Sequence, residues 1–178
     1  MKFDSTLADE HTLVDKNKYW EKNMKNYEEL FMESKGRPII VNGEQLYSTD
    51  KIPVKHDFSI ALRILSVDSE YPQIIELSAG RNGSLLYNNQ TEPKLSILAD
   101  TTPLNQDITI SGTTDSGELL VWNAWIMKDH LGNDVKHSWR NCAAMKKEAI
   151  GNTIRYSCND GFPDDDFNDL VFEIRLEP

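Results

Sequence analysis

Short segments of alternating apolar and polar residues, separated by turn-forming residues, fill the chain from Arg37 onward. In the last of them, large apolar side chains occupy every second position and would share one face of a strand. The segments that predict strands are Pro38–Val41, Phe58–Ser66, Gln73–Ser78, Ser84–Tyr87, Lys94–Leu98, Asp107–Ser111, Glu118–Met127, Thr153–Cys158 and Leu170–Leu176. So many short strands predict an all-β fold, an antiparallel β-sandwich, with a barrel as the alternative.

The N-terminal part of the chain has a different pattern. Asp15–Ser34 contains no Gly or Pro, and its apolar residues recur at spacings of three and four, which predicts an amphipathic helix. Asp15 is a suitable N-cap, and Gly36 and Pro38 would end the helix. We therefore expect an N-terminal helical extension over residues 1–36 and a β-sandwich domain over residues 37–178. The apolar stripe would pack on this domain or on a second subunit.

Charge and hydropathy exclude several classes of partner. The formal net charge of the 178 residues is −10, which argues against binding to nucleic acid or to an anionic membrane surface. No apolar run reaches the roughly 18 residues that a membrane span needs. The first residues lack the apolar core of a classical secretory signal, so we expect synthesis in the cytoplasm. Release or display at the cell surface by another route stays open.

The strongest chemical signal is the acidic loop, Asn159–Asp169 (NDGFPDDDFND), which carries seven Asp or Asn side chains. Calcium takes six to eight oxygen ligands of this kind. One divalent cation would leave the loop with excess negative charge, so two ions are expected. The loop does not fit an EF-hand, because the spacing of Gly and Glu and the flanking helices are not those of that motif. A solvated acidic loop without a metal is the alternative.

The run Asp164–Asp169 (DDDFND), followed by an alternating strand, resembles the signature of the calcium-mediated bacterial lectins. These are small β-sandwich proteins that bind fucose or mannose through two calcium ions, which the sugar hydroxyls coordinate directly. The resemblance implies a homodimer through the C-terminus, because a partner's terminal carboxylate reaches the site in that family. It implies the metal ligands Asp160, Asp164, Asp166, Asn168, Asp169 and, nine positions after Asp169, Pro178.

A second stretch, Ile52–Ile60, resembles the opening strand of the same lectins. The family places an Asn calcium ligand and a short sugar-specificity loop just after that strand. Here Ile64–Ser69 contains no Asn, and Ser66 or Asp68 are the candidate substitutes. The sugar-binding residues implied by the resemblance are Asp164, Asp166, Asp169, Ser66 and Asp68.

These observations favour a calcium-dependent carbohydrate-binding protein, a lectin for a fucose- or mannose-like glycan. The alternative is a β-sandwich with structural calcium that serves adhesion or assembly and binds no sugar. We expect no enzyme, since hydrolase, metalloprotease and nucleotide-binding motifs are missing from the sequence.

Two further sets of side chains leave alternatives open. Trp122, Trp125 and Trp139 could stack on sugar rings or belong to the core, and at least one of the first two should be core. Cys142 and Cys158 flank a turn-like stretch around residue 150, which permits either a disulfide or two buried thiols.

Overall fold

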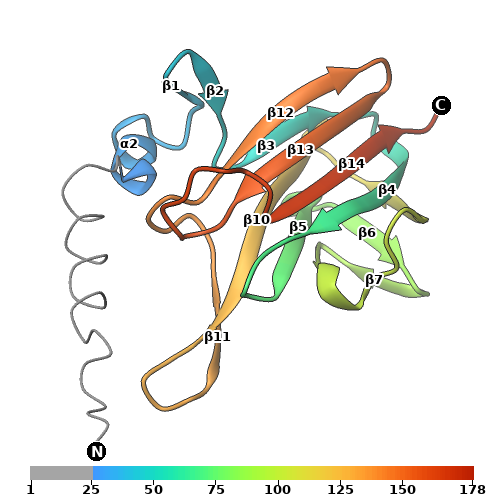
Figure 1. Cartoon of the computed structure of the whole chain (residues 1–178). Coiled ribbons are helices and arrows are strands. Elements are labelled where there is room, and N and C mark those ends of the chain that lie inside the picture. The colour runs from blue at the N-terminus through green and yellow to red at the C-terminus, as the bar shows by residue number, and fades with distance from the viewer. Residues whose placement is uncertain (1–25) are drawn as a thin grey trace, which may run out of the picture.

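The computed structural model of the protein describes residues 26–178 and has two main antiparallel sheets packed face to face (Figure 1). The larger sheet has the strand order β12-β13-β14-β4-β9-β6-β7. The smaller has the order β11-β10-β5-β8, and β3 also pairs with β10. A separate hairpin joins β1 to β2. Since both main sheets are open at their edges, the predicted β-sandwich is confirmed and the barrel alternative is wrong.

The elements of the seven-stranded sheet are β4 (Asp57–Val67), β6 (Ser84–Tyr87), β7 (Gln90–Glu92), β9 (Asp107–Thr113), β12 (Ala144–Ile150), β13 (Thr153–Asn159) and β14 (Leu170–Leu176). Those of the smaller sheet are β3 (Asp50–Pro53), β5 (Gln73–Ser78), β8 (Lys94–Leu98), β10 (Glu118–Lys128) and β11 (Asp134–His137). The remaining elements are α2 (Tyr27–Glu33), β1 (Ile39–Val41), β2 (Glu44–Leu46) and the 3-10 turn η1 (Ala99–Thr101).

All nine predicted strands are present, and four of them have the predicted bounds. Five strands escaped the sequence analysis: β2, β3, β7, β11 and β12. Four of these have only three or four residues, too few for an alternating pattern to stand out. The fifth, β12, lies at an edge of its sheet and has charged residues at its centre, so its apolar face is short.

The core lies between the two sheets. Ile60, Leu62 and Ile64 of β4 face inward, and the apolar side chains of β5, β10 and β14 meet them. Phe172 stacks on Tyr156 at 5.0 Å between ring centroids. The Tyr156 hydroxyl donates a hydrogen bond to the buried carboxylate of Asp50. This packing fixes β13 and β14 as neighbours and therefore fixes the ends of the loop between them.

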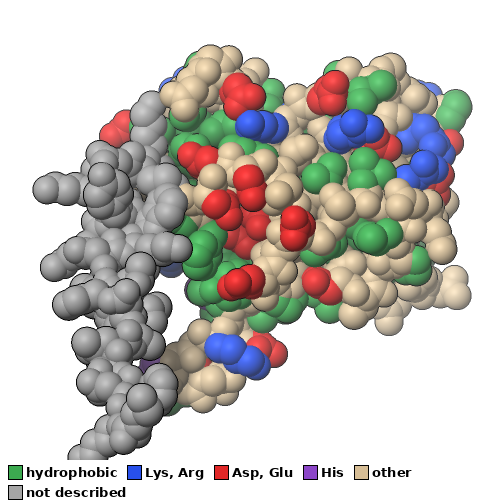
Figure 2. Space-filling view, viewed as in Figure 1, with side chains coloured by type: hydrophobic (Ala, Val, Ile, Leu, Met, Phe, Trp, Pro, Cys, Tyr) green, Lys and Arg blue, Asp and Glu red, His purple; other side chains and the backbone are tan. Residues whose placement is uncertain are grey.

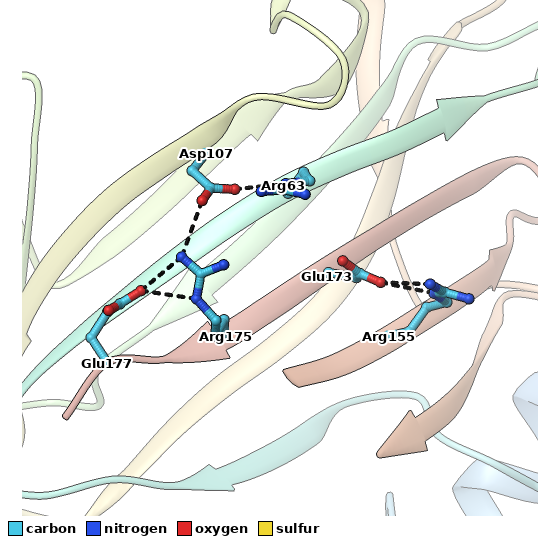
Figure 3. A network of polar contacts seen from close by, with 6 residues as sticks. All are labelled: Arg63, Asp107, Arg155, Glu173, Arg175 and Glu177. Atoms are coloured by element: carbon cyan, nitrogen blue, oxygen red, sulfur yellow. Dashed lines mark hydrogen bonds and ion pairs between the residues drawn. The ribbon is translucent and has the colours of Figure 1, made fainter. Parts of the chain in front are cut away.

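The outer face of the seven-stranded sheet is held by ion pairs (Figure 3). Asp107 on β9 accepts hydrogen bonds from Arg63 on β4 and from Arg175 on β14, which lower its pKa below the usual value, chiefly through Arg63. Arg155 on β13 makes a two-nitrogen contact with Glu173 on β14. These pairs link successive strands on the solvent side, while apolar side chains link them on the core side.

The helix α2 corrects the predicted continuous helix over Asp15–Ser34. Asn26 has an extended backbone (φ −72°, ψ 103°), and its side chain caps α2 by accepting from the Glu28 amide. A helix cannot pass through this conformation, so α2 begins after it. Its C-terminal end at Glu33 agrees with the prediction. Residues 1–25, including the predicted cap Asp15, lie outside the described part, and the domain boundary at residue 36 stays a prediction.

A second apolar cluster lies beneath α2. It combines residues from the helix, the β1–β2 hairpin, the start of β12 with the segment before it, and the acidic loop, namely Tyr27, Phe31, Val41, Leu46, Cys142, Ala144 and Phe167. The turn of the hairpin, Asn42-Gly43, has positive φ at both residues (53° and 84°), as a tight turn between antiparallel strands requires. The cluster therefore connects the N-terminal part of the described chain to the acidic loop.

No disulfide joins Cys142 to Cys158, and both are buried thiols. The β12–β13 hairpin places Met145 opposite Cys158, so Cys142 falls three positions out of register. Burial raises the pKa of Cys142 to about 11 and that of Cys158 well above its usual value. Of the two alternatives, the structure has the buried thiols.

Within residues 26–178, none of the helices has the length and apolar character that crossing a membrane demands.

Candidate metal centre

The acidic loop joins β13 to β14 at one end of the sandwich. Its ends are close together because Cys158 pairs with Leu170 across the two strands. Asp165 and Phe167 have positive φ values (57° and 56°), a conformation that is uncommon for residues other than Gly. Figure 2 shows Asp and Glu side chains gathered over this loop. The chain is thus bent into a strained shape where negative charge is most concentrated.

Three carboxylates converge in the loop. Asp164, Asp166 and Asp169 each place an oxygen within 4.8 Å of the others. Asp164 and Asp166 are exposed, whereas Asp169 is buried. One side of this triad therefore faces solvent, while the other is fixed within the protein.

Asp169 is held by backbone contacts from two segments. Its Oδ2 accepts a hydrogen bond of 2.7 Å from the Asp160 amide, and its carbonyl oxygen accepts one from the Asp68 amide. Opposite the start of β14, the register of β4 shifts between Val171 and Phe172. Such bulges redirect neighbouring side chains and are common beside functional sites.

The electrostatics of the triad favour a bound cation. Burial, together with the negative charges of Asp160, Asp164 and Asp166, raises the pKa of Asp169 to about 7. Burial and the neighbouring Asp166 and Asp160 carboxylates likewise raise the pKa of Asp164. A carboxylate whose charge is opposed in this way is stabilised by any cation placed between it and its neighbours.

An orphaned buried atom lies in the same loop. The Asn168 side-chain oxygen is buried and has no hydrogen-bond partner. The same holds for the side-chain oxygens of Gln73 and Asn159. An unpartnered buried acceptor costs free energy unless an unseen group satisfies it. Carboxylate and carboxamide oxygens are the ligands that calcium uses. The donor set of the loop therefore fits calcium, with Asp164, Asp166, Asp169 and Asn168 as the residues that would hold it.

Asp160 has a different environment from the triad. It is 1% exposed. Its Oδ2 accepts from the Ser69 hydroxyl and the Gln73 amide group, and its Oδ1 accepts from the Phe162 amide. Those donors already stabilise its charge, so within the protein Asp160 organises the loop. Its predicted role as a metal ligand stays a prediction.

A hollow of about 280 Å³ opens beside the triad. Its lining residues come from the acidic loop and from the segment after β4, namely Asp68, Ser69, Glu70, Tyr71, Asp160, Phe162, Asp164 and Asp169. Tyr71 and Phe162 form a tilted pair at 5.8 Å between ring centroids, and Phe162 is 49% exposed. The hollow thus combines carboxylates with an accessible aromatic edge.

The structure brings some predicted residues to this site and places others elsewhere. Asp68 lines the hollow, and its role as a substitute for the lectin Asn stays a prediction. Ser66 is exposed on β4, pairs with Val171 and does not line it. Pro178 follows the opposite end of β14 from the acidic loop. Within one chain it does not reach the triad, so its predicted role requires a second subunit.

Sequence reasoning missed the segment Ser69–Gln73. Ser69 and Gln73 donate to Asp160, and Tyr71 supplies the aromatic partner of Phe162. The segment is about 90 residues from the acidic loop, and nothing in its composition links the two. The only available signal was its position directly after the predicted strand Phe58–Ser66, where the lectin family places its specificity loop.

The three tryptophans lie apart from the triad. Trp122 and Trp125 are both buried, which confirms that at least one is core. Trp139 is 48% exposed and packs against Trp122 at 5.5 Å between ring centroids. Trp125 lies directly under Gly161, where an added Cβ would come within 2.5 Å of the indole ring. Trp125 therefore supports the acidic loop from below.

No family model matches the sequence, and no curated protein is significantly similar to it. Among solved structures, the chain is similar to the Chromobacterium violaceum lectin CV2L in complex with alpha-methyl-fucoside. The two share 15% sequence identity over 74% of this chain and 96% of that chain, with a TM-score of 0.36. A TM-score of this size carries no inference about metal, ligand or site.

Proposed function

We propose that the protein is a calcium-dependent carbohydrate-binding protein whose site is the acidic loop and the hollow beside it. The observation that carries the proposal is the convergence of Asp164, Asp166 and Asp169 within 4.8 Å, with its outer side exposed. Calcium held there would keep coordination positions on its solvent side. Two neighbouring hydroxyls of a sugar can occupy such positions by replacing water.

The residues around the triad suit a sugar ring. Sugars present apolar C–H faces as well as hydroxyls, so their sites combine aromatic side chains with polar groups. Here Phe162, paired with Tyr71, offers the aromatic surface, and the carboxylates of Asp68 and Glu70 offer hydrogen-bond acceptors. We propose a fucose- or mannose-like residue as the ligand, because the lectins that the loop resembles bind these sugars.

We further propose two calcium ions and a second subunit. Asp68, Glu70 and Asp160 surround the triad with additional negative charge, which one divalent cation would not neutralise. We propose that Pro178 of a second copy of the chain reaches the site, because within one chain it follows the end of β14 that is far from the acidic loop. No catalytic step is part of the proposal.

The second candidate is a structural calcium site that binds no sugar. It is supported by Phe167, which anchors the loop in the buried cluster beneath α2. A site whose only task is to stabilise this junction would need no open coordination position.

Glycan-array binding in calcium and in EDTA tests the proposal. We expect binding to fucose- or mannose-containing glycans in calcium and its loss in EDTA. Asp164→Asn should abolish it, whereas Asp57→Asn, an exposed carboxylate at the opposite end of β4, should not. Phe162→Ala should weaken sugar binding and leave calcium binding intact. An array without signal in calcium, from protein that binds the ion, would favour the structural candidate.

A further inference from the structure

The acidic loop has two faces, and only one of them is used by the proposed function. Asp164, Asp166 and Asp169 converge on one face. Two of the residues between them, Asp165 and Phe167, turn the other way, and both have positive φ. From Asp164 to Phe167, neighbouring side chains therefore point to opposite sides, as they do in a strand, whereas Asp169 returns to the face of the triad.

The second face of the loop contacts α2. The Tyr27 hydroxyl, in the first turn of the helix, donates a 2.8 Å hydrogen bond to Oδ1 of Asp165. Phe167 is 6% exposed and belongs to the cluster that contains Tyr27 and Phe31. The Lys146 ammonium lies 4.2 Å from the centre of the Phe167 ring and covers it. A polar contact and an apolar contact thus attach alternate loop residues to the same helix.

The helix also has contacts that do not involve the acidic loop. The Glu28 amide donates to the Asn141 carbonyl oxygen, and the Asn141 amide donates to the Glu28 carboxylate. Arg140 adds an ion pair with Glu28. Because these contacts involve the segment before β12 rather than the loop, α2 has a fixed position against which the loop can be held.

We infer that α2 is the positioning element of the acidic loop, and that Tyr27 and Phe167 are the positioning residues that hold its three converging carboxylates together. The inference rests on the proposed calcium site. The energetic reason is that Asp164, Asp166 and Asp169 repel one another, and two residues of the loop occupy a backbone conformation that L-amino acids disfavour. Contacts on the far side of the loop offset both costs before the ion arrives.

Such an arrangement couples the helix to the ion in both directions. If the docked helix raises calcium affinity by some factor, bound calcium stabilises the docked helix by the same factor. A contact that is merely structural would stabilise the chain equally with and without calcium. The two cases therefore differ in a measurable way.

The test is calcium titration by calorimetry on Tyr27→Phe, with Tyr87→Phe as the matched control. Tyr87 is partly buried on β6, three strands away from β14, so its change removes the same hydroxyl at a distance. We expect about tenfold weaker calcium binding for Tyr27→Phe, as for the loss of one hydrogen bond to a charged group, and no change for Tyr87→Phe.

Hydrogen exchange on the α2 amides supplies the reciprocal measurement. Calcium should slow exchange over Tyr27–Glu33 in the unaltered protein and should not do so in Asp166→Asn. Equal calcium affinity of Tyr27→Phe and the unaltered protein would overturn the inference, as would α2 exchange that does not respond to calcium. If the unaltered protein takes up no calcium in the same titration, the proposed calcium site itself is wrong, and the positioning role falls with it.

Discussion

At Asp169, burial and the charge of the carboxylate oppose each other. The residue is buried, its neighbours are negatively charged, and two backbone contacts still hold it in place. The sequence indicated the types and spacing of the loop carboxylates, because calcium chemistry requires many oxygen ligands in a short stretch. It could not indicate that Asp160 would be satisfied by Ser69 and Gln73, since that depends on how distant segments pack.

Replacing Asp166 by Asn should affect stability only when calcium is present. The change removes one charged ligand from the triad, so the melting temperature in calcium should fall by roughly 3–8 °C. In EDTA it should stay the same or rise slightly, because one source of repulsion is gone. Thermal unfolding followed by circular dichroism in both buffers checks this. Asp134→Asn, an exposed residue of β11, is the control. Equal shifts in both buffers would remove Asp166 from the metal site.

Calcium affinity should depend on pH through Asp169. Its pKa in the metal-free folded protein is raised to about 7, so below that pH a calcium ion must displace a proton. We expect binding about tenfold weaker at pH 6 than at pH 8. For the same reason, the contribution of Asp169 to metal-free stability should be greatest at acid pH and should fall as the pH rises toward 7, since a raised pKa favours the protonated folded state. Calorimetric titration at several pH values measures the first effect, and an affinity that does not vary over this range would contradict it.

Comparison of the predicted and observed strands shows that the length of a strand affects whether its sequence reveals it. Of the strands with five or more residues, all except β12 were found, and Gln73–Ser78 and Leu170–Leu176 have the predicted bounds. Strands such as β7, whose three residues are all exposed, exist because a neighbouring strand offers hydrogen bonds rather than because their side chains require burial. The helix was predicted to be continuous through Asn26 because the apolar spacing continues there, whereas the extended backbone of Asn26, whose side chain caps α2, interrupts it.

Gly161 is one point at which the acidic loop contacts β10. Because an added Cβ would lie 2.5 Å from Trp125, Gly161→Ala should push the loop away from the sheet. We expect a loss of about 1–3 kcal/mol in the free energy of unfolding, the usual cost of overpacking, together with weaker calcium binding. Gly151→Ala is a suitable comparison at the β12–β13 turn, where an added Cβ meets no atom but the positive φ of 64° adds strain. It should destabilise the protein without changing calcium affinity. Gly161→Ala with full calcium affinity would show that contact with Trp125 does not shape the site.

At the scale of the whole molecule, the sandwich brings the two halves of the site together. The acidic loop follows β13, and the segment Ser69–Gln73 follows β4. The loop and the segment meet because β14 pairs with both β13 and β4. A sequence read segment by segment identifies the loop but not its partner segment. The sheet order that makes them neighbours depends on non-local pairing, which alternation alone does not specify.

Calcium should stabilise the whole fold by mass action. An ion that binds only the folded state adds about 2.7 kcal/mol when its concentration is a hundred times its dissociation constant. For a domain of this size that corresponds to an increase of about 5–10 °C in melting temperature. Differential scanning calorimetry over a calcium series checks the dependence, with magnesium as the comparison ion. Identical melting curves with and without calcium would contradict a site in the folded protein.

The two-faced acidic loop also sets how this protein can tolerate changes in length. One residue inserted between Asp164 and Phe167 would change which side chains of the loop face the triad and which face α2. Side chains that now point outward would be pressed under α2, and the Phe167 ring would be turned toward water. The tip of the β12–β13 hairpin, where Gly151 has open space around it, does not depend on such an arrangement of side chains and can be lengthened. Variation in chain length among proteins with this site should therefore collect at that tip and spare the acidic loop.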